Sequence, residues 1–140
     1  MFTFVPESCF DAAAKLLVKE LSNIPPFECN FESVSYFEKG NSVIWINQDT
    51  EAIKRFEHLQ KRVAKLFPYC DEKKNDSGEF VPHMTVGYAP KTIIERVHKQ
   101  VAEEWKSQTV TVNEICMIYR PDKDTCFKTI HRIPLGGNKD

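Results

Sequence analysis

The chain has 140 residues, a formal net charge of −1 at pH 7 and 41% hydrophobic residues, so it can bury the core of one domain. This balanced charge argues against a protein that grips long nucleic-acid duplexes through a strongly basic surface, but it allows a small or single-stranded ligand. No apolar run approaches the ~18 residues of a membrane span, and no secretory signal is recognisable, which predicts a cytoplasmic protein that binds no membrane. The five cysteines form no close pair, so reduced thiols are expected rather than a zinc site or a disulfide framework.

The first third of the chain predicts a helix followed by a β-hairpin. Apolar residues recur at helical spacing after Pro6, and the pair Pro25-Pro26 ends the pattern, because proline cannot continue the hydrogen-bond ladder. The apolar side of this helix comprises Phe10, Ala13, Leu17 and Leu21. Residues 27–37 then alternate as a half-buried strand whose phase shifts near Ser33. A turn at 38–41 leads into a second strand at 42–47.

The rest of the chain predicts two helices and three strands. A helix capped by Asp49 or Thr50 is expected over 49–67, with Ile53, Phe56, Val63 and Leu66 on its apolar side. After a polar loop at 68–79, the expected elements are a strand at 80–88, a helix capped by Thr92, a long strand at 109–119 and a last strand at 125–135. Ile94, Val97, Val101 and Trp105 form the apolar side of the Thr92 helix. The tail from Gly136 is expected to be frayed.

The order of elements suggests two copies of one unit within a single α+β domain. The segment Phe4-Val5-Pro6 aligns with Tyr88-Ala89-Pro90, and each leads into a helix and then a hairpin. The predicted units span about 1–47 and 80–135, joined by the helix at 49–67 and the loop at 68–79. The alternative is that the match reflects only a common α+β order of elements.

The segment at 80–88 carries the residues best suited to chemistry. In a regular strand His83, Thr85 and Gly87 point to one face, and Met84, Val86 and Tyr88 point to the other. An imidazole can transfer a proton near neutral pH, and a neighbouring hydroxyl can hydrogen-bond a phosphate oxygen. Taken without further context, a lone histidine in a strand is more often structural than catalytic.

The segment Pro82-His83-Met84-Thr85-Val86 resembles the second His-x-Thr motif of the two-histidine (2H) phosphoesterases, in the branch of the 2′-5′ RNA ligase-like proteins and cyclic phosphodiesterases. The likeness extends over nearly the whole chain, through the following further segments: Phe4–Glu7, Pro25–Phe27, Val34–Phe37, Val43–Ile46, Phe127 and Ile133–Leu135. The resemblance implies two pseudo-symmetric lobes of antiparallel sheet with helices outside, around a groove to which each lobe contributes one His-x-Thr.

The resemblance also implies a chemistry that needs no metal and no cofactor. One histidine is the general base and the other the general acid in cleaving a phosphodiester of an RNA end or small nucleotide, often a 2′,3′-cyclic phosphate or a 2′-5′ linkage. By position, His83 is one proton-transfer group and Thr85 one phosphate clamp. Tyr88 is a candidate for packing on a base or sugar, provided that the strand twists or bulges after Gly87.

The chain departs from the family at the first motif. That motif would fall before Met1, or a short gap aligns Met1-Phe2-Thr3-Phe4 with His83–Val86, keeping Thr3 as a substrate-binding hydroxyl with methionine in the place of histidine. Either alignment predicts a truncated gene model, a fragment or a degenerate member with impaired catalysis, and an incomplete first lobe that could pair with a second copy in a homodimer. The rival hypotheses are a non-catalytic module that binds nucleotides or RNA ends, and a protein-interaction remnant.

Three other histidines are candidates to replace the missing one. His58 and His98 lie among charged residues of predicted helices, so each is expected to be solvated. His131 lies in the last strand and could reach the groove, but a structural role is the favoured interpretation. The lysine and arginine clusters are most simply solvated faces.

Overall fold

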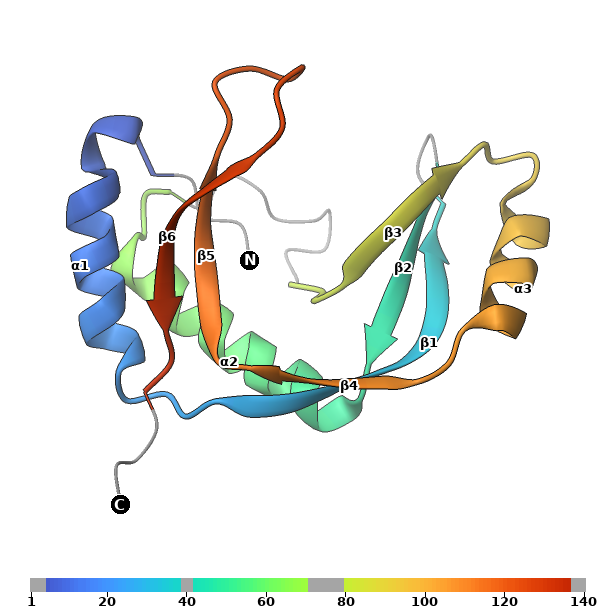
Figure 1. The fold of residues 1–140 in the computed structure, drawn as a ribbon, viewed down its shortest axis with the longest axis horizontal. Helices are drawn as coiled ribbons and strands as arrows, with labels where there is room; N and C mark the ends of the chain where they lie inside the picture. The colour runs from blue at the N-terminus through green and yellow to red at the C-terminus, as the bar shows by residue number, and fades with distance from the viewer. Residues whose placement is uncertain (1–4, 39–41, 71–79, 137–140) are drawn as a thin grey trace. The chain divides into compact units, whose positions relative to one another are not determined.

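The computed structural model describes residues 5–38, 42–70 and 80–136, in which the chain forms two compact units. Unit 1 comprises Met1–Phe27, His58–Phe80 and Thr111–Asp140, and unit 2 comprises Glu28–Glu57 and Val81–Val110. Each unit is therefore built from segments far apart in the sequence. The predicted α+β class is confirmed, with antiparallel sheets and packed helices in the described residues (Figure 1). None of the described helices is long and apolar enough to cross a membrane.

Unit 1 packs helix α1, Phe10–Leu21, against a two-stranded antiparallel sheet of β5, Glu114–Tyr119, and β6, Lys128–Pro134. A short 3₁₀ helix, η1 (Glu7–Cys9), precedes α1. The helix buries Ala13, Ala14, Leu17 and Leu21, which confirms the predicted apolar side and adds Ala14 to it. Since β5 and β6 alternate their side chains between two faces, only one face of this sheet contacts α1.

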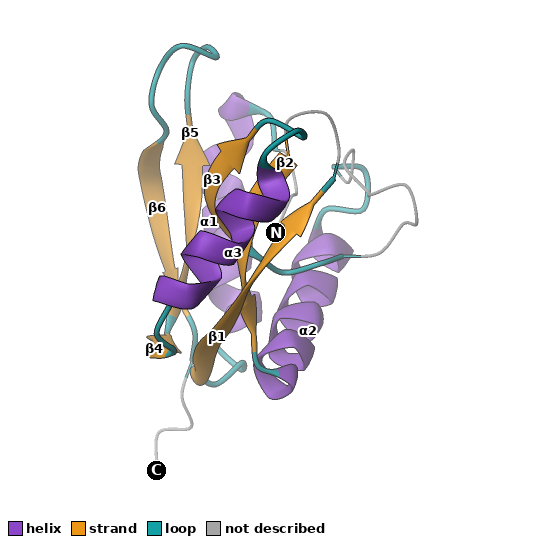
Figure 2. Cartoon of the chain, turned by 90° about the vertical axis from the view of Figure 1, so that its right-hand side faces the viewer, coloured by secondary structure: helices purple, strands orange, loops and turns teal. Residues whose placement is uncertain are grey.

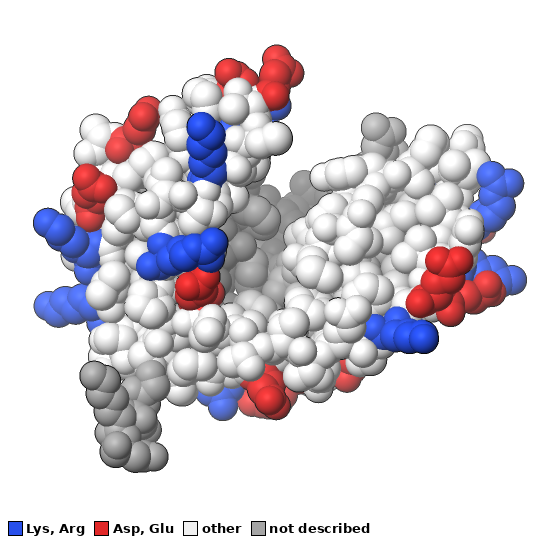
Figure 3. Space-filling model, in the orientation of Figure 1, with Lys and Arg blue, Asp and Glu red and all other residues white. Residues whose placement is uncertain are grey.

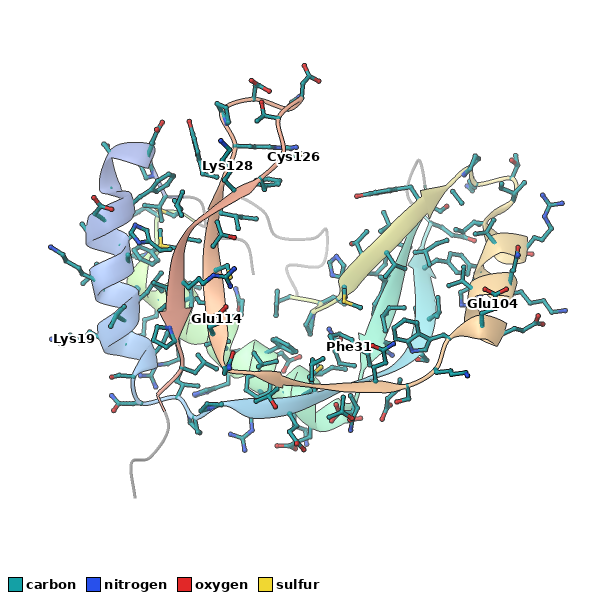
Figure 4. The ribbon with its side chains drawn as sticks, viewed as in Figure 1. Lys19, Phe31, Glu104, Glu114, Cys126 and Lys128 are labelled. Carbon is teal, nitrogen blue, oxygen red and sulfur yellow. The ribbon has the colours of Figure 1, made fainter. Side chains whose placement is uncertain are left out.

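The α1 side of this small sheet is fixed by polar and aromatic contacts. The Phe10 ring meets the Tyr119 ring edge-on at 5.6 Å between centroids, and the Tyr119 hydroxyl donates to Glu7 at 3.1 Å. Nε2 of His131 lies 3.0 Å from Oδ1 of Asp11. On the opposite face the Arg132 guanidinium donates to Glu114, the residue labelled at the start of β5 in Figure 4.

Unit 2 is organised around a four-stranded sheet in the order β3-β2-β1-β4. The strands are β1 (Phe27–Phe37), β2 (Ser42–Gln48), β3 (Met84–Ala89) and β4 (Gln108–Val112). The antiparallel pair of β1 and β2 confirms the predicted hairpin, and its register shifts between Phe31 and Ser33, where the sequence pattern changes phase. The turn residues 39–41 lie outside the described residues.

Helix α3, Ile94–Glu104, covers one face of this sheet (Figures 1 and 2). The core beneath it joins Val34, Ile44, Ile46, Ala89 and Ile94, with Val97, Val101 and Trp105 packed against them as predicted. Two hydrogen bonds to β1 fix the helix. The Trp105 indole N–H donates to the Phe31 carbonyl at 3.1 Å, and Nε2 of His98 lies 2.7 Å from the Val34 carbonyl oxygen. His98 is therefore a half-buried link between helix and sheet, and the expectation of a solvated side chain was wrong.

Helix α2, Thr50–Leu66, is preceded by Asp49, whose carboxylate accepts hydrogen bonds from backbone N–H groups. Oδ2 accepts from Ala52 at 3.2 Å, which confirms Asp49 as the cap, and Oδ1 accepts from Asn30 in β1 at 2.8 Å. Ala52, Leu59 and Val63 are the buried residues of the helix, whereas Ile53, Phe56 and Leu66 are half-buried. The buried side is thus centred slightly away from the predicted one.

Four predictions about where elements begin, end or are capped were wrong. The strand expected from residue 80 begins at Met84, because Pro82 has no N–H to offer a neighbouring strand. The third helix begins at Ile94 with no side-chain cap, so Thr92 does not cap it. The strand expected at 109–119 breaks at Asn113 into β4 and β5 of different sheets. Gly136, expected to be frayed, is held by its N–H, which donates to the Leu21 carbonyl at 2.9 Å.

Candidate active site

Strand β3 contains an irregularity that sets the direction of its side chains. In its pairing with β2, Thr85 lies opposite Trp45 and Gly87 lies opposite Ile44, so Val86 is an extra residue with no partner. Such a β-bulge shifts the alternation of all the residues that follow it. Residues opposite one another in an antiparallel pair point to the same face, so the bulge decides which side chains share a face.

The bulge brings Tyr88 to the face that carries Thr85. Tyr88 lies opposite Val43, and Val43 shares a face with Trp45, the partner of Thr85. The strand therefore contains the bulge that Tyr88 needs to share a face with Thr85, but the extra residue is Val86 and lies before Gly87. Gly87 lies opposite Ile44, a residue of the core under α3, so the expectation that Gly87 shares the face of Thr85 was wrong.

His83 precedes β3 and is held by one hydrogen bond and two aromatic rings. Its Nδ1 lies 2.7 Å from the Val81 carbonyl oxygen. Its ring meets the rings of Phe37 and Trp45 edge-on, at 5.4 and 6.0 Å between centroids, and these two rings stack on each other at 4.9 Å. Because Phe37 and Trp45 lie on the face of Thr85, the half-buried imidazole also lies on that face.

The carbonyl contact fixes the protonation pattern of the neutral imidazole. A carbonyl oxygen can only accept a hydrogen bond, so Nδ1 must carry the proton that points at Val81. Nε2 is then the lone-pair nitrogen of the neutral ring and a donor in the imidazolium. The ring is thereby arranged to exchange a proton through Nε2 alone.

The surroundings of this imidazole suit a small anionic or aromatic ligand. Thr85 is exposed, and Tyr88 is 71% exposed, so both are open to solvent. The sequence from Phe80 to Pro90 holds no charged side chain. In Figure 3 charged residues gather around α3, whereas the surface over β3 is uncharged. A hydroxyl, an imidazole and an open phenol thus lie together on one sheet face.

No other histidine joins His83 among the described contacts. His131 points to the α1 side of its sheet and contacts Asp11, His98 contacts the Val34 carbonyl, and His58 is exposed on α2. Thr3, the other candidate substrate-binding residue, lies outside the described residues. In the described ranges no group of three or more His, Cys, Asp or Glu side chains is arranged to hold a metal ion.

Phe37 and Trp45 contact the candidate catalytic imidazole but were not singled out as site residues from the sequence. Both lie in segments that resemble the family, yet the sequence gives no pairing register between the hairpin and residue 83. They share a face because Phe37 pairs with Val43, which lies two residues before Trp45 in β2. The signal was present in the sequence, but it depended on long-range pairing.

Comparison with protein families identifies the family of the chain. The family model of the 2′-5′ RNA ligase superfamily matches residues 1–124 of the chain. The chain therefore belongs to the 2′-5′ RNA ligase superfamily, the class of two-histidine phosphoesterases. A search of curated proteins finds no match.

Proposed function

We propose that this chain acts on a phosphodiester of an RNA end or a small nucleotide through His83 and Thr85. The observation that carries the proposal is the His-x-Thr pair on one open face of sheet β3-β2-β1-β4, in a chain of the 2′-5′ RNA ligase superfamily. Nε2 of His83 exchanges the proton, the Thr85 hydroxyl donates to a non-bridging phosphate oxygen, and Tyr88 packs on the base or sugar. A 2′,3′-cyclic phosphate or a 2′-5′ linkage is the substrate class that we propose, with no metal or cofactor.

The second candidate is a non-catalytic module that binds the same ligands. The 140-residue sequence contains one His-x-Thr, and a single imidazole cannot be base and acid in the same step. The loss of one such group typically lowers the rate by about 10²–10⁴-fold. We therefore expect the chain by itself to bind nucleotide ends and to turn over 2′,3′-cyclic nucleotides slowly or not at all.

One set of variants tests both candidates. His83→Ala and Thr85→Val are compared with His58→Ala, which removes an exposed imidazole that lies on a different element. Turnover of 2′,3′-cyclic AMP is followed by chromatography, and binding of 2′-AMP and 3′-AMP is followed by calorimetry. We expect both site variants to weaken binding and any turnover, with His58→Ala unchanged. A wild-type chain that neither binds nor cleaves these ligands would refute both candidates.

A homodimer remains part of the proposal. Among the described residues β3 pairs only with β2, and its exposed side chains Met84, Val86 and Tyr88 are uncharged. An uncharged edge strand is prone to pair with another chain. Light scattering over a concentration series should show association that Val86→Lys abolishes, whereas a monomer at all concentrations would contradict it.

A further inference from the structure

The basic residues of helix α2 fall into two sets that the sequence does not separate. The arginines have acidic partners: Arg55 lies 3.5 Å from Glu51, and Arg62 lies 2.5 Å from Glu20. The lysines of this helix have no ion-pair partner among the residues that the structure describes. Within the described part of the chain, their charges are therefore not neutralised by an acidic side chain.

These lysines share one side of the helix. Lys54, Lys61 and Lys65 follow one another at intervals of seven and four residues, which places them in line, and all three are exposed. We call this row the cationic stripe. At 1.5 Å per residue it extends for about 16 Å along the helix.

We propose that the cationic stripe binds the phosphates of a single RNA strand, an inference that rests on the proposed action on RNA. At about 3.4 Å of helix axis per phosphate in each strand, its length matches roughly five phosphates of a stacked strand. Lysine is suited to this role as a mobile point charge that neutralises phosphate without reading the base. The substrate would then be an RNA of several nucleotides rather than a mononucleotide.

The composition of α2 favours RNA over a membrane or a protein partner. A helix that binds a membrane surface exposes an apolar face beside its basic one. Here the apolar residues Ala52, Leu59 and Val63 are buried in the protein. Protein interfaces are centred on exposed aromatic or aliphatic side chains, and the stripe contains none.

The salt dependence of RNA binding tests the proposal. Anisotropy of a fluorescein-labelled oligouridylate of about twelve nucleotides is measured from 50 to 400 mM KCl, with the slope of log K against log salt near −0.7 per phosphate neutralised. The triple variant Lys54→Gln, Lys61→Gln, Lys65→Gln should reduce this slope by about two. Because the two lines converge near 1 M salt, affinity at 0.1 M should fall by up to about a hundredfold.

A matched control changes the same total charge elsewhere. Lys91, Lys99 and Lys106 are exposed residues of unit 2, and their conversion to glutamine should leave the slope of the wild-type chain. Equal losses in both triple variants would show a general charge effect and overturn the proposal, as would a wild-type chain that does not bind the oligonucleotide. If the triple variant of Lys54, Lys61 and Lys65 lost binding to phosphatidylserine vesicles but kept its RNA binding, the proposal would be overturned in favour of a membrane surface.

The same measurement separates this inference from the proposed function. His83→Ala should abolish any cleavage of cyclic phosphate while preserving the salt slope. A chain that binds the oligonucleotide through the stripe but neither binds nor cleaves 2′,3′-cyclic and 2′-5′ phosphodiesters would refute the proposed function. It would not refute RNA binding by helix α2.

Discussion

Replacing Asp49 with alanine should test how the hairpin is attached to helix α2. The carboxylate accepts one N–H at the start of the helix, from Ala52, and one from Asn30 in β1, while the Asp49 N–H donates to the Asn30 carbonyl at 3.0 Å. Loss of a helix cap costs about 1 kcal/mol. Loss of a hydrogen bond to a charged acceptor costs about 1.5–3 kcal/mol, and partial exposure of Asp49 favours the lower end. The total is about 2–3 kcal/mol.

Urea unfolding, followed by the fluorescence of Trp45 and Trp105, measures the stability that Asp49→Ala loses. For a domain of this size the midpoint of thermal unfolding should fall by about 10 °C. Asp49→Asn keeps one acceptor oxygen and should lose about half as much stability. An Asp49→Ala chain as stable as the wild type would refute the argument that these two bonds hold the hairpin to the helix.

The ionisation of Asp49 adds a dependence on pH. The pKa of this carboxyl is below its usual range, chiefly because the Asn30 N–H donates to it. A lowered folded-state pKa contributes stability above the unfolded pKa of about 3.9 and loses it as the pH falls through the folded value. The advantage of the wild type over Asp49→Asn should therefore be constant from pH 5 to 7 and shrink below about pH 4. A difference that stays constant to pH 2 would contradict this reasoning.

Three further outcomes are expected. Burial, with a smaller contribution from Asp49, raises the pKa of Cys29 to about 11, so this thiol should react with Ellman's reagent at pH 8 only after unfolding. The exposed cysteines should react in the native chain; these are Cys9, Cys116 and Cys126. Gly136→Ala should cost about 1–3 kcal/mol in urea unfolding, because the new Cβ would lie 1.5 Å from the Ser22 carbonyl oxygen, whereas Gly87→Ala, with no atom within 4 Å, should be nearly neutral. Any turnover should survive EDTA, and activity restored by zinc or manganese after its loss would refute the metal-free chemistry.

Local patterns predicted most of the elements, because each depends on residues close in sequence. The helical spacing of Ala13, Leu17 and Leu21 and the phase shift near Ser33 both have counterparts in the structure. The shared face of His83 and Thr85 also follows from alternation over two residues. Such signals need no knowledge of distant partners.

The parts that were not predictable depend on long-range contacts. The break at Asn113 appears only when β4 joins one sheet and β5 another, and the Asn113 carbonyl accepts from the Leu135 N–H at 2.8 Å. The role of His98 depends on the Val34 carbonyl, 64 residues away. The aromatic contacts of His83 likewise require the pairing of three strands.

The extra residue at Val86 makes the spacing of the motif as important as its composition. The distance of three residues from Thr85 to Tyr88 would put the two side chains on opposite faces of a regular strand. If β3 kept this spacing but ran without the bulge, every side-chain type of the site would remain, but Tyr88 would point to the face opposite Thr85. A chain with the same His-x-Thr letters and no bulge would thus present a different neighbour to the ligand. The bulge, and not the motif alone, therefore decides which side chain accompanies the candidate proton-transfer group.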